Sequence, residues 1–228
     1  MPVPHSSQRS PARGLFLTLD GPDGGGKTTQ AAALAAWLRA RGFDVVTCRD
    51  PGGTPLGDRL RHLLLDRETV PPTLRAEMLL YMASRAQLVE DVIRPSLKAG
   101  RVVISDRFLL ANIVYQGYAG GLPADEVGRV GQLATGGLLP DLTLLLDVPT
   151  SLARARVGPA RDRIEDRPES YHAEVREGFL RAAREGRDRP CPYYPAPIVV
   201  INASADPEVV AGRIQSEVER ALALDPRS

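Results

Sequence analysis

Short runs of consecutive apolar residues alternate along the chain with longer segments whose composition favours helices. Runs rich in valine, isoleucine and leucine, without a polar residue at every second position, are typical of strands buried on both faces. The predicted strands are Leu15–Leu19, Val45–Cys48, Val102–Ser105, Leu142–Leu146 and Ile198–Ile201. The predicted helices are Thr28–Ala40, Leu56–Leu65, Thr73–Leu97, Leu109–Tyr115, Asp125–Thr135, Glu169–Glu185 and Pro207–Leu222. This alternation predicts an α/β fold with a five-stranded parallel sheet covered by helices on both faces.

Composition limits the organisation and the partners. No repeat or linker divides the pattern, so we expect residues 14–228 to form one domain, after a disordered leader at residues 1–13. That leader is rich in proline, serine and arginine and lacks the apolar core of a secretory signal. The formal net charge of +1 provides no overall field for a nucleic acid polymer or an anionic membrane. Cys48 and Cys191 have no paired spacing, which suits a reducing cytoplasm.

The clearest chemical signal is Gly-Pro-Asp-Gly-Gly-Gly-Lys-Thr at residues 21–28, which fits the phosphate-loop pattern G-x-x-x-x-G-K-[ST]. Glycines let backbone N–H groups turn inward around phosphate oxygens, and the helix that follows adds its positive dipole end. We expect Lys27 to reach the β- and γ-phosphates of ATP and the Thr28 hydroxyl to bind Mg²⁺. The loop lies between a predicted strand and a predicted helix, which indicates a P-loop NTPase-type three-layer α/β/α fold. The predicted nucleotide-binding residues are Gly21, Pro22, Asp23, Gly24, Gly25, Gly26, Lys27, Thr28 and Thr29.

Further motifs follow the P-loop in a fixed order. They are Arg49-Asp50-Pro51-Gly52-Gly53-Thr54, Asp106-Arg107-Phe108, Tyr115-Gln116-Gly117 and Asp162-Arg163-Ile164-Glu165. With Asp23 inside the loop, this set resembles the thymidylate kinase family of bacterial type, although the family usually has glutamate where Asp50 stands. The resemblance implies transfer of the γ-phosphoryl group of ATP to dTMP with Mg²⁺, a step of dTTP biosynthesis. It also implies a homodimer.

The resemblance gives roles to the polar residues near the P-loop. Asp106 would lie near Mg²⁺ or its waters, and it is expected to be catalytic together with Lys27 and Arg107. Arg107 and Arg49 would hold the acceptor phosphate through charge-assisted hydrogen bonds. Asp23 would accept a hydrogen bond from the 3′-hydroxyl of the acceptor. Two alternatives stay open: Asp23 could bond only its own loop, and Asp106 and Arg107 could form a structural salt bridge.

A second group of residues would read the base and sugar. Tyr81 and Arg85 are four residues apart on one helix face. At these positions the family has an aromatic residue that stacks on thymine and an arginine that hydrogen-bonds the base. The spacing alone also fits a core tyrosine with a solvated arginine. Asn112, Tyr115 and Gln116 fall where the family places groups near the base and sugar.

Arginines crowd a segment at about residues 154–167, and we interpret this segment as a lid. Its arginines are Arg154, Arg156, Arg161, Arg163 and Arg167. Such a run is usually a solvated face, but an arginine can also neutralise the charge that spreads over the transferring phosphoryl group. The P-loop contains no arginine, and family members of this kind carry the catalytic arginine in the lid. We therefore assign the role to Arg161, with Arg156 as the second choice.

Two rival functions remain at this point. One is a P-loop kinase for another nucleoside monophosphate or for a deoxynucleoside. The other is a nucleotide-dependent switch ATPase that transfers nothing to a small molecule.

Overall fold

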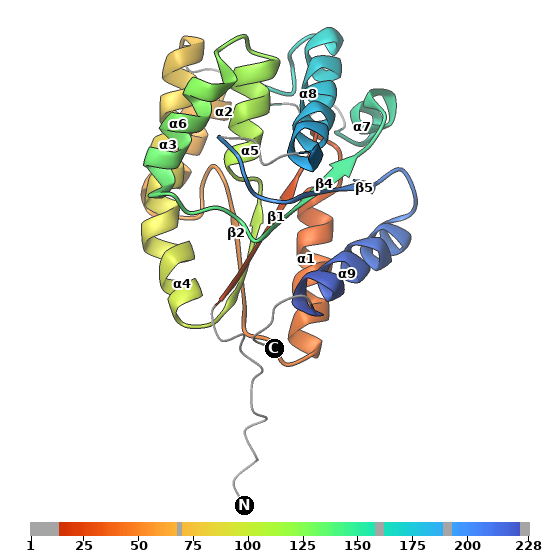
Figure 1. Cartoon of the computed structure of the whole chain (residues 1–228). Helices are drawn as coiled ribbons and strands as arrows, with labels where there is room; N and C mark the ends of the chain where they lie inside the picture. Colours follow the sequence, from red (N-terminus) through yellow and green to blue (C-terminus); the bar gives the residue numbers. More distant parts are fainter. Residues whose placement is uncertain (1–13, 68–69, 158–161, 189–192, 224–228) are drawn as a thin grey trace, which may run out of the picture.

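The computed structural model describes residues 14–67, 70–157, 162–188 and 193–223. Its strands are β1 (Leu15–Asp20), β2 (Val45–Arg49), β3 (Val102–Asp106), β4 (Leu142–Asp147) and β5 (Ile198–Asn202). All neighbouring strands run parallel, in the order β2-β3-β1-β4-β5 (Figure 1). The predicted five-stranded parallel sheet is therefore confirmed. Each strand begins at the predicted residue and continues to the polar residue that follows the apolar run.

Helices fill the connections between these strands, and one more helix follows β5. They are α1 (Lys27–Ala40), α2 (Pro55–Leu65), α3 (Leu74–Leu88), α4 (Arg94–Lys98), α5 (Leu109–Asn112), α6 (Ala124–Thr135), α7 (Thr150–Val157), α8 (Glu169–Asp188) and α9 (Pro207–Ala223). Two π-helical turns, η1 (Val89–Ile93) and η2 (Ile113–Tyr118), continue α3 and α5. The single helices predicted at Thr73–Leu97 and Leu109–Tyr115 are thus each interrupted by a π turn. Helix α7 was not predicted.

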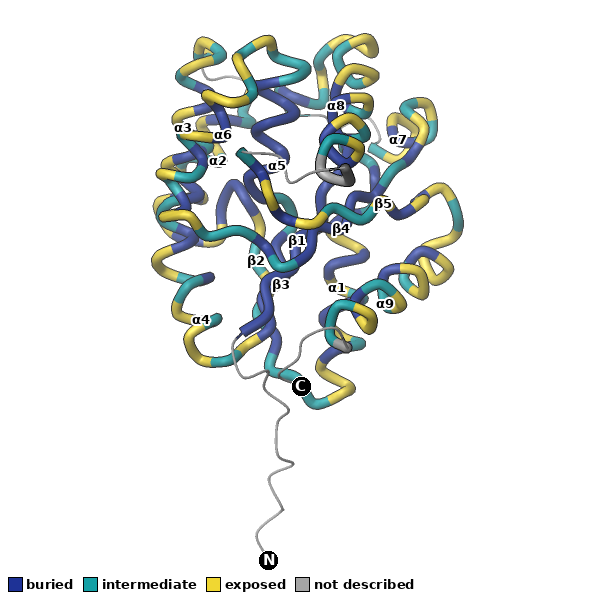
Figure 2. Tube along the Cα trace, in the orientation of Figure 1, coloured by how far each residue is buried: buried dark blue, intermediate teal, exposed yellow. Residues whose placement is uncertain are grey.

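The helices form two layers with separate cores. Along β1, Leu17 and Leu19 belong to the core with α1 and α9, whereas Phe16 belongs to the core with α3, α5, α6 and α8. The buried strands lie between these layers (Figure 2). β1, β3 and β4 are buried on both faces as predicted. The edge strands β2 and β5 are only partly buried, because each has a neighbouring strand on one side alone.

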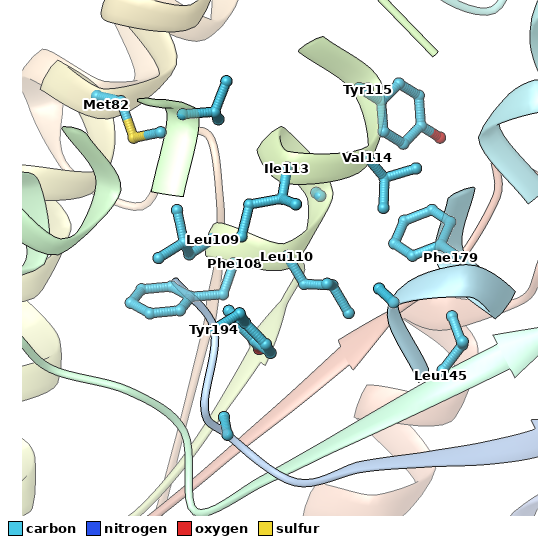
Figure 3. Packing of buried hydrophobic residues seen from close by; sticks show 14 of the residues in the cluster. Met82, Phe108, Leu109, Leu110, Ile113, Val114, Tyr115, Leu145, Phe179 and Tyr194 are labelled. Carbon is cyan, nitrogen blue, oxygen red and sulfur yellow. The ribbon is translucent and has the colours of Figure 1, made fainter. Parts of the chain in front are cut away.

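The core on the Phe16 face lies directly beneath the residues predicted to bind the acceptor. Side chains from α5, η2, α8 and β4 meet there, with Phe108 and Tyr115 among them (Figure 3). The rings of Phe16 and Phe108 pack edge to face with centroids 4.9 Å apart. This packing holds α5 and η2 against the sheet. Within the described ranges, every helix is too short or too polar to span a lipid bilayer.

Candidate active site

The phosphate loop connects β1 to α1 at the carboxyl edge of the sheet. Gly24 has φ 75°, and a Cβ atom there would lie 2.0 Å from the carbonyl oxygen of Ala153 in α7, so only glycine fits. The Lys27 ammonium donates to the carbonyl of Pro22 at 2.8 Å and to that of Gly21 at 3.3 Å. Burial, with help from the nearby Arg107, lowers the pKa of Lys27 to about 8. The lysine is therefore held against the loop, in a place where an anionic phosphate would stabilise its charge.

A cavity of about 720 Å³ opens beside this loop, at the carboxyl ends of β2 and β3. Its lining includes all the predicted acceptor-binding residues: Asp23, Arg49, Tyr81, Arg85, Arg107, Asn112, Tyr115 and Gln116. Gly24, Gly26, Lys27, Thr28, Thr29, Asp106 and Arg156 also line it. Gly21, Pro22 and Gly25 belong to the loop but lie outside the lining. Arg161, the predicted catalytic arginine, lies outside the described residues.

Asp23, Arg107 and Tyr115 form a compact polar cluster on the cavity wall. Arg107 has φ 69°, a conformation that costs energy for a residue with a side chain. Its guanidinium donates to the Asp23 carboxylate and, at 3.1 Å, to the Tyr115 hydroxyl, which itself donates to Asp23 at 2.8 Å. Burial alone would raise the pKa of Asp23, but Arg107 and Lys27 outweigh it and bring the pKa down to about 2. The carboxylate is thus charged, and its side-chain partners come from outside the loop.

Thr28 and Asp106 supply a pair of oxygen atoms next to the loop. The Thr28 hydroxyl donates to the Asp106 carboxylate at 2.6 Å. Oxygen ligands from one or two side chains, completed by phosphate and water, are the usual environment of Mg²⁺ beside a nucleotide. Within the described part of the chain, no group of three His, Cys, Asp or Glu side chains could hold a metal ion. The two oxygens therefore fit a magnesium ion that arrives with nucleotide phosphates.

Arg85 lines the cavity and is almost completely buried, with its side chain 1% exposed. It forms an ion pair with Asp50 and donates to the carbonyl of Phe108 at 3.2 Å. The alternative of a solvated arginine is therefore wrong. Tyr81, one helical turn earlier, is half-buried and lines the same cavity. The aspartate that replaces the usual glutamate at position 50 still reaches Arg85.

The π turn η2 determines which side chains face the cavity. Its wider backbone bond runs from the N–H of Ala119 to the carbonyl of Val114. Asn112, Tyr115 and Gln116, on either side of the start of this turn, all line the cavity. Asn112 donates to Gln116 at 2.7 Å. π turns occur often at functional sites, where they change the direction of side chains.

Sequence reasoning missed Glu77, which is buried in α3. Its carboxylate accepts from Arg163 at 2.7 Å and from Arg167 at 3.0 Å, and both belong to the predicted lid. These two arginines therefore neutralise a buried acid. Glu77 lies four residues before Tyr81 and on the same helix face, and that spacing is the signal that could have found it.

A phosphate loop whose lysine and strand-end carboxylate lie next to an arginine-lined acceptor cavity defines the class of P-loop kinases. The sequence model of the thymidylate kinase family matches residues 19–214. Thymidylate kinase from Caldanaerobacter subterraneus subsp. tengcongensis is 46% identical over 180 residues, which cover 78% of this chain and 85% of that protein. The enzyme from Leifsonia xyli subsp. xyli is 44% identical over 210 residues, with coverage of 90% and 95%. The crystal structure of thymidylate kinase from Ehrlichia chaffeensis superposes with a TM-score of 0.70 at 28% identity, covering 90% of this chain and 99% of that one.

This chain belongs to the thymidylate kinase family. The resemblance found in the sequence motifs is confirmed, as are the P-loop fold and the class of enzyme. The rival assignment to a switch ATPase is set aside.

Proposed function

We propose that this protein phosphorylates dTMP to dTDP with ATP and Mg²⁺, and that the cavity residues named above carry out the reaction. One observation carries the proposal: a single cavity joins the P-loop to a buried end that contains Tyr81, Arg85 and Asn112. The loop suits the phosphates of ATP, and the far end suits a planar base with hydrogen-bonding groups. A second phosphate would lie between them, next to Arg107.

The donor side uses the loop and its neighbours. The backbone N–H groups of residues 21–29 and the Lys27 ammonium would bind the ATP phosphates. Thr28 and Asp106 would hold Mg²⁺, which in such sites neutralises charge on the β- and γ-phosphates. The geometry of these two side chains, 2.6 Å apart, supports the assignment.

On the acceptor side, Arg107 and Arg49 would bind the phosphate of dTMP, and Asp23 would accept a hydrogen bond from its 3′-hydroxyl. Tyr81 would stack on thymine. Arg85, Asn112, Tyr115 and Gln116 complete the proposed base and sugar site. An acceptor phosphate oxygen is already anionic, so catalysis needs positioning and charge neutralisation and no general base. Arg161 would provide the additional positive charge in the transition state.

We also propose that the enzyme is a cytoplasmic homodimer. Exposed leucines lie on the neighbouring helices α2, α3 and α6, where Leu79 is 50% and Leu133 is 83% exposed. Large apolar side chains exposed on helices that pack against one another support an interface between subunits.

The test of the function is an ADP-release assay with Mg-ATP and each of dTMP, dUMP, dCMP, dGMP, AMP and thymidine. Strong preference for dTMP is expected. Tyr81→Ala should raise the KM for dTMP roughly 10- to 100-fold, because stacking of a base on an aromatic ring contributes about 1–3 kcal/mol. Tyr81→Phe keeps the ring face and is the matched control. Turnover with another monophosphate, or an unchanged KM in Tyr81→Ala, would refute the base site.

A further inference from the structure

Four buried side chains form a continuous hydrogen-bonded chain, which we call the amide relay: Arg85, Asn112, Gln116 and Glu77. Arg85 donates to Oδ1 of Asn112, and Nδ2 of Asn112 donates to Oε1 of Gln116 at 2.7 Å. Nε2 of Gln116 donates to Oε1 of Glu77 at 2.9 Å. Each of these residues is at most 2% exposed.

The two ends of the relay fix the orientation of both amides. A guanidinium group can only donate hydrogen bonds, and a carboxylate can only accept them. Reversing the amides would place the Asn112 NH₂ group against Arg85 and the Gln116 carbonyl oxygen against Glu77. One contact between two donors and one contact between two acceptors would result. Each would leave buried polar groups without a hydrogen-bond partner, which lowers the stability of the folded protein. The Glu77 carboxylate also accepts from Arg163 at 2.7 Å and from Arg167 at 3.0 Å.

The orientation of these amides matters because Asn112 and Gln116 line the cavity, whereas Glu77 does not. An amide offers an N–H on one side and a carbonyl oxygen on the other. Thymine and uracil present an N–H at ring position 3 and an oxygen at position 4. Cytosine presents the opposite pattern, an accepting nitrogen and a donating amino group. A cavity with fixed amides can therefore favour one pattern over the other.

We propose that Glu77 is a positioning residue that sets the base preference of the acceptor cavity by fixing the amides of Gln116 and Asn112. The inference rests on the proposed base site. Glu77 acts through its neighbours and touches no substrate. It is the only member of the relay that combines a charge with acceptor-only chemistry, so a donor placed there opposes the direction that Arg85 imposes from the other end.

Glu77→Gln tests this directly. The new amide would keep its oxygen at the Oε2 position, toward Arg163 and Arg167, and turn its NH₂ group toward Gln116, giving up the longer 3.3 Å bond from Arg167 to Oε1. Because Arg85 still donates at the other end, one contact between two donors is then unavoidable. The amides either keep their directions and meet it at position 77, or reverse and place the Asn112 NH₂ group against Arg85. The readout is the ratio of kcat/KM for dUMP to that for dCMP, since these substrates have nearly the same shape and opposite hydrogen-bond patterns. We expect the ratio to fall roughly 10-fold or more.

The matched control is Glu90→Gln, which makes the same chemical change at an exposed glutamate whose partner is Arg94. It should leave the ratio unchanged. A second control is Arg163→Lys. It weakens the ion pair at Oε2 of Glu77 and leaves the hydrogen bond from Gln116 to Oε1, and so the orientation of both amides, unchanged. It should lower thermal stability and leave the ratio unchanged.

A rescue variant distinguishes an effect of amide orientation from a general loss of function. Gln116→Glu alone brings two carboxylates together and should impair the enzyme. In the double variant E77Q/Q116E, the new carboxylate at position 116 accepts from both neighbours, so Asn112 keeps its original orientation. The double variant should recover part of the ratio lost in Glu77→Gln, because Asn112 regains its orientation although the amide at position 116 is replaced.

Several outcomes would overturn the proposal. One is a folded Glu77→Gln enzyme with the wild-type ratio, and another is a double variant that recovers nothing. If Glu77→Gln fails to fold, recovery of folding and ratio in E77Q/Q116E supports the relay, and failure of both variants overturns it. Asn112→Ala tests the proposed base site separately from the role of Glu77. If it lowers the ratio and Glu77→Gln does not, only the role of Glu77 is wrong; if it has no effect, the proposed base site is wrong as well.

Discussion

The carboxyl group of Asp20 should make the stability of this protein depend on pH, and one substitution should remove that dependence. Asp20 is the last residue of β1 and follows Phe16 and Thr18 on the same face of the strand. It is fully buried, and neither of its oxygens has a hydrogen-bond partner among the described residues. Burial raises its pKa from 3.8 to about 7, although Arg107 and Lys27 favour the charged form.

The sign of the effect follows from proton binding. Between the two pKa values the folded state holds the proton more tightly than the unfolded state, so the free energy of unfolding falls as pH rises. The full loss between pH 3.8 and about 7 is roughly 4 kcal/mol, at 1.36 kcal/mol per pH unit. Asp20→Asn has the shape of the protonated acid and cannot ionise. Its stability relative to the wild type should therefore rise across this window and level off above it.

The assay is urea unfolding of the wild type and of Asp20→Asn at pH 5 and at pH 8. From pH 5 to about 7, the wild type should lose roughly 3 kcal/mol relative to the variant. Any fixed cost of placing an amide in this site cancels in the comparison between the two pH values. Asp125→Asn, at an exposed aspartate, is the control and should show almost no pH-dependent difference. A difference between Asp20→Asn and wild type that is equal at both pH values, within about 0.5 kcal/mol, would refute the reasoning.

Three further predictions concern catalysis and assembly. Arg161→Ala should lower kcat roughly 10- to 1000-fold with little change in the KM for ATP, because its charge is needed mainly in the transition state; an unchanged kcat in steady-state assays would move the role to Arg156 or elsewhere. Asp23→Asn should raise the KM for dTMP more than that for ATP, and equal losses would indicate that Asp23 only stabilises the loop. Leu133→Glu should convert the proposed dimer to monomer in sedimentation experiments, by placing a charge in an apolar contact, whereas an unchanged mass would exclude this face of α6 from the interface.

The sequence predicted the sheet because periodicity reports burial directly. Each strand extends one residue beyond its apolar run, and these last residues include Asp20, Arg49 and Asp106. In a parallel sheet the carboxyl ends meet at one edge, so motifs far apart in the chain lie around one cavity. Asp23, Arg49, Asp106 and Arg107 could therefore be predicted from motifs placed at strand ends, whereas the helical residues Tyr81, Arg85, Asn112, Tyr115 and Gln116 were assigned through the family resemblance.

Features that depend on tertiary partners were not predictable in the same way. The π turns are short changes in backbone hydrogen bonding within a helix, and a hydrophobic pattern hardly registers them. Helix α7 is a short segment in which arginines alternate with alanines, and its backbone carbonyl at Ala153 packs against Gly24. Its eight residues are too few for a helix to be stable without tertiary packing. Asp20 likewise looks like an ordinary polar residue at a strand end until its burial is known.

The lid illustrates how a buried acid changes the interpretation of an arginine-rich segment. Arg163 and Arg167 form ion pairs with Glu77, which lies about 90 residues earlier in the chain. The remaining lid arginines that the structure describes, Arg154 and Arg156, bind Glu169 and the Ala203 carbonyl oxygen. Every described arginine of the segment thus has a protein partner, and two of them are committed to an acid outside the cavity. A catalytic arginine must give its donors to the phosphoryl group. Arg156 could do so only after it leaves the Ala203 carbonyl oxygen. The kcat values of Arg161→Ala and Arg156→Ala, measured side by side, therefore decide which of the two arginines is catalytic.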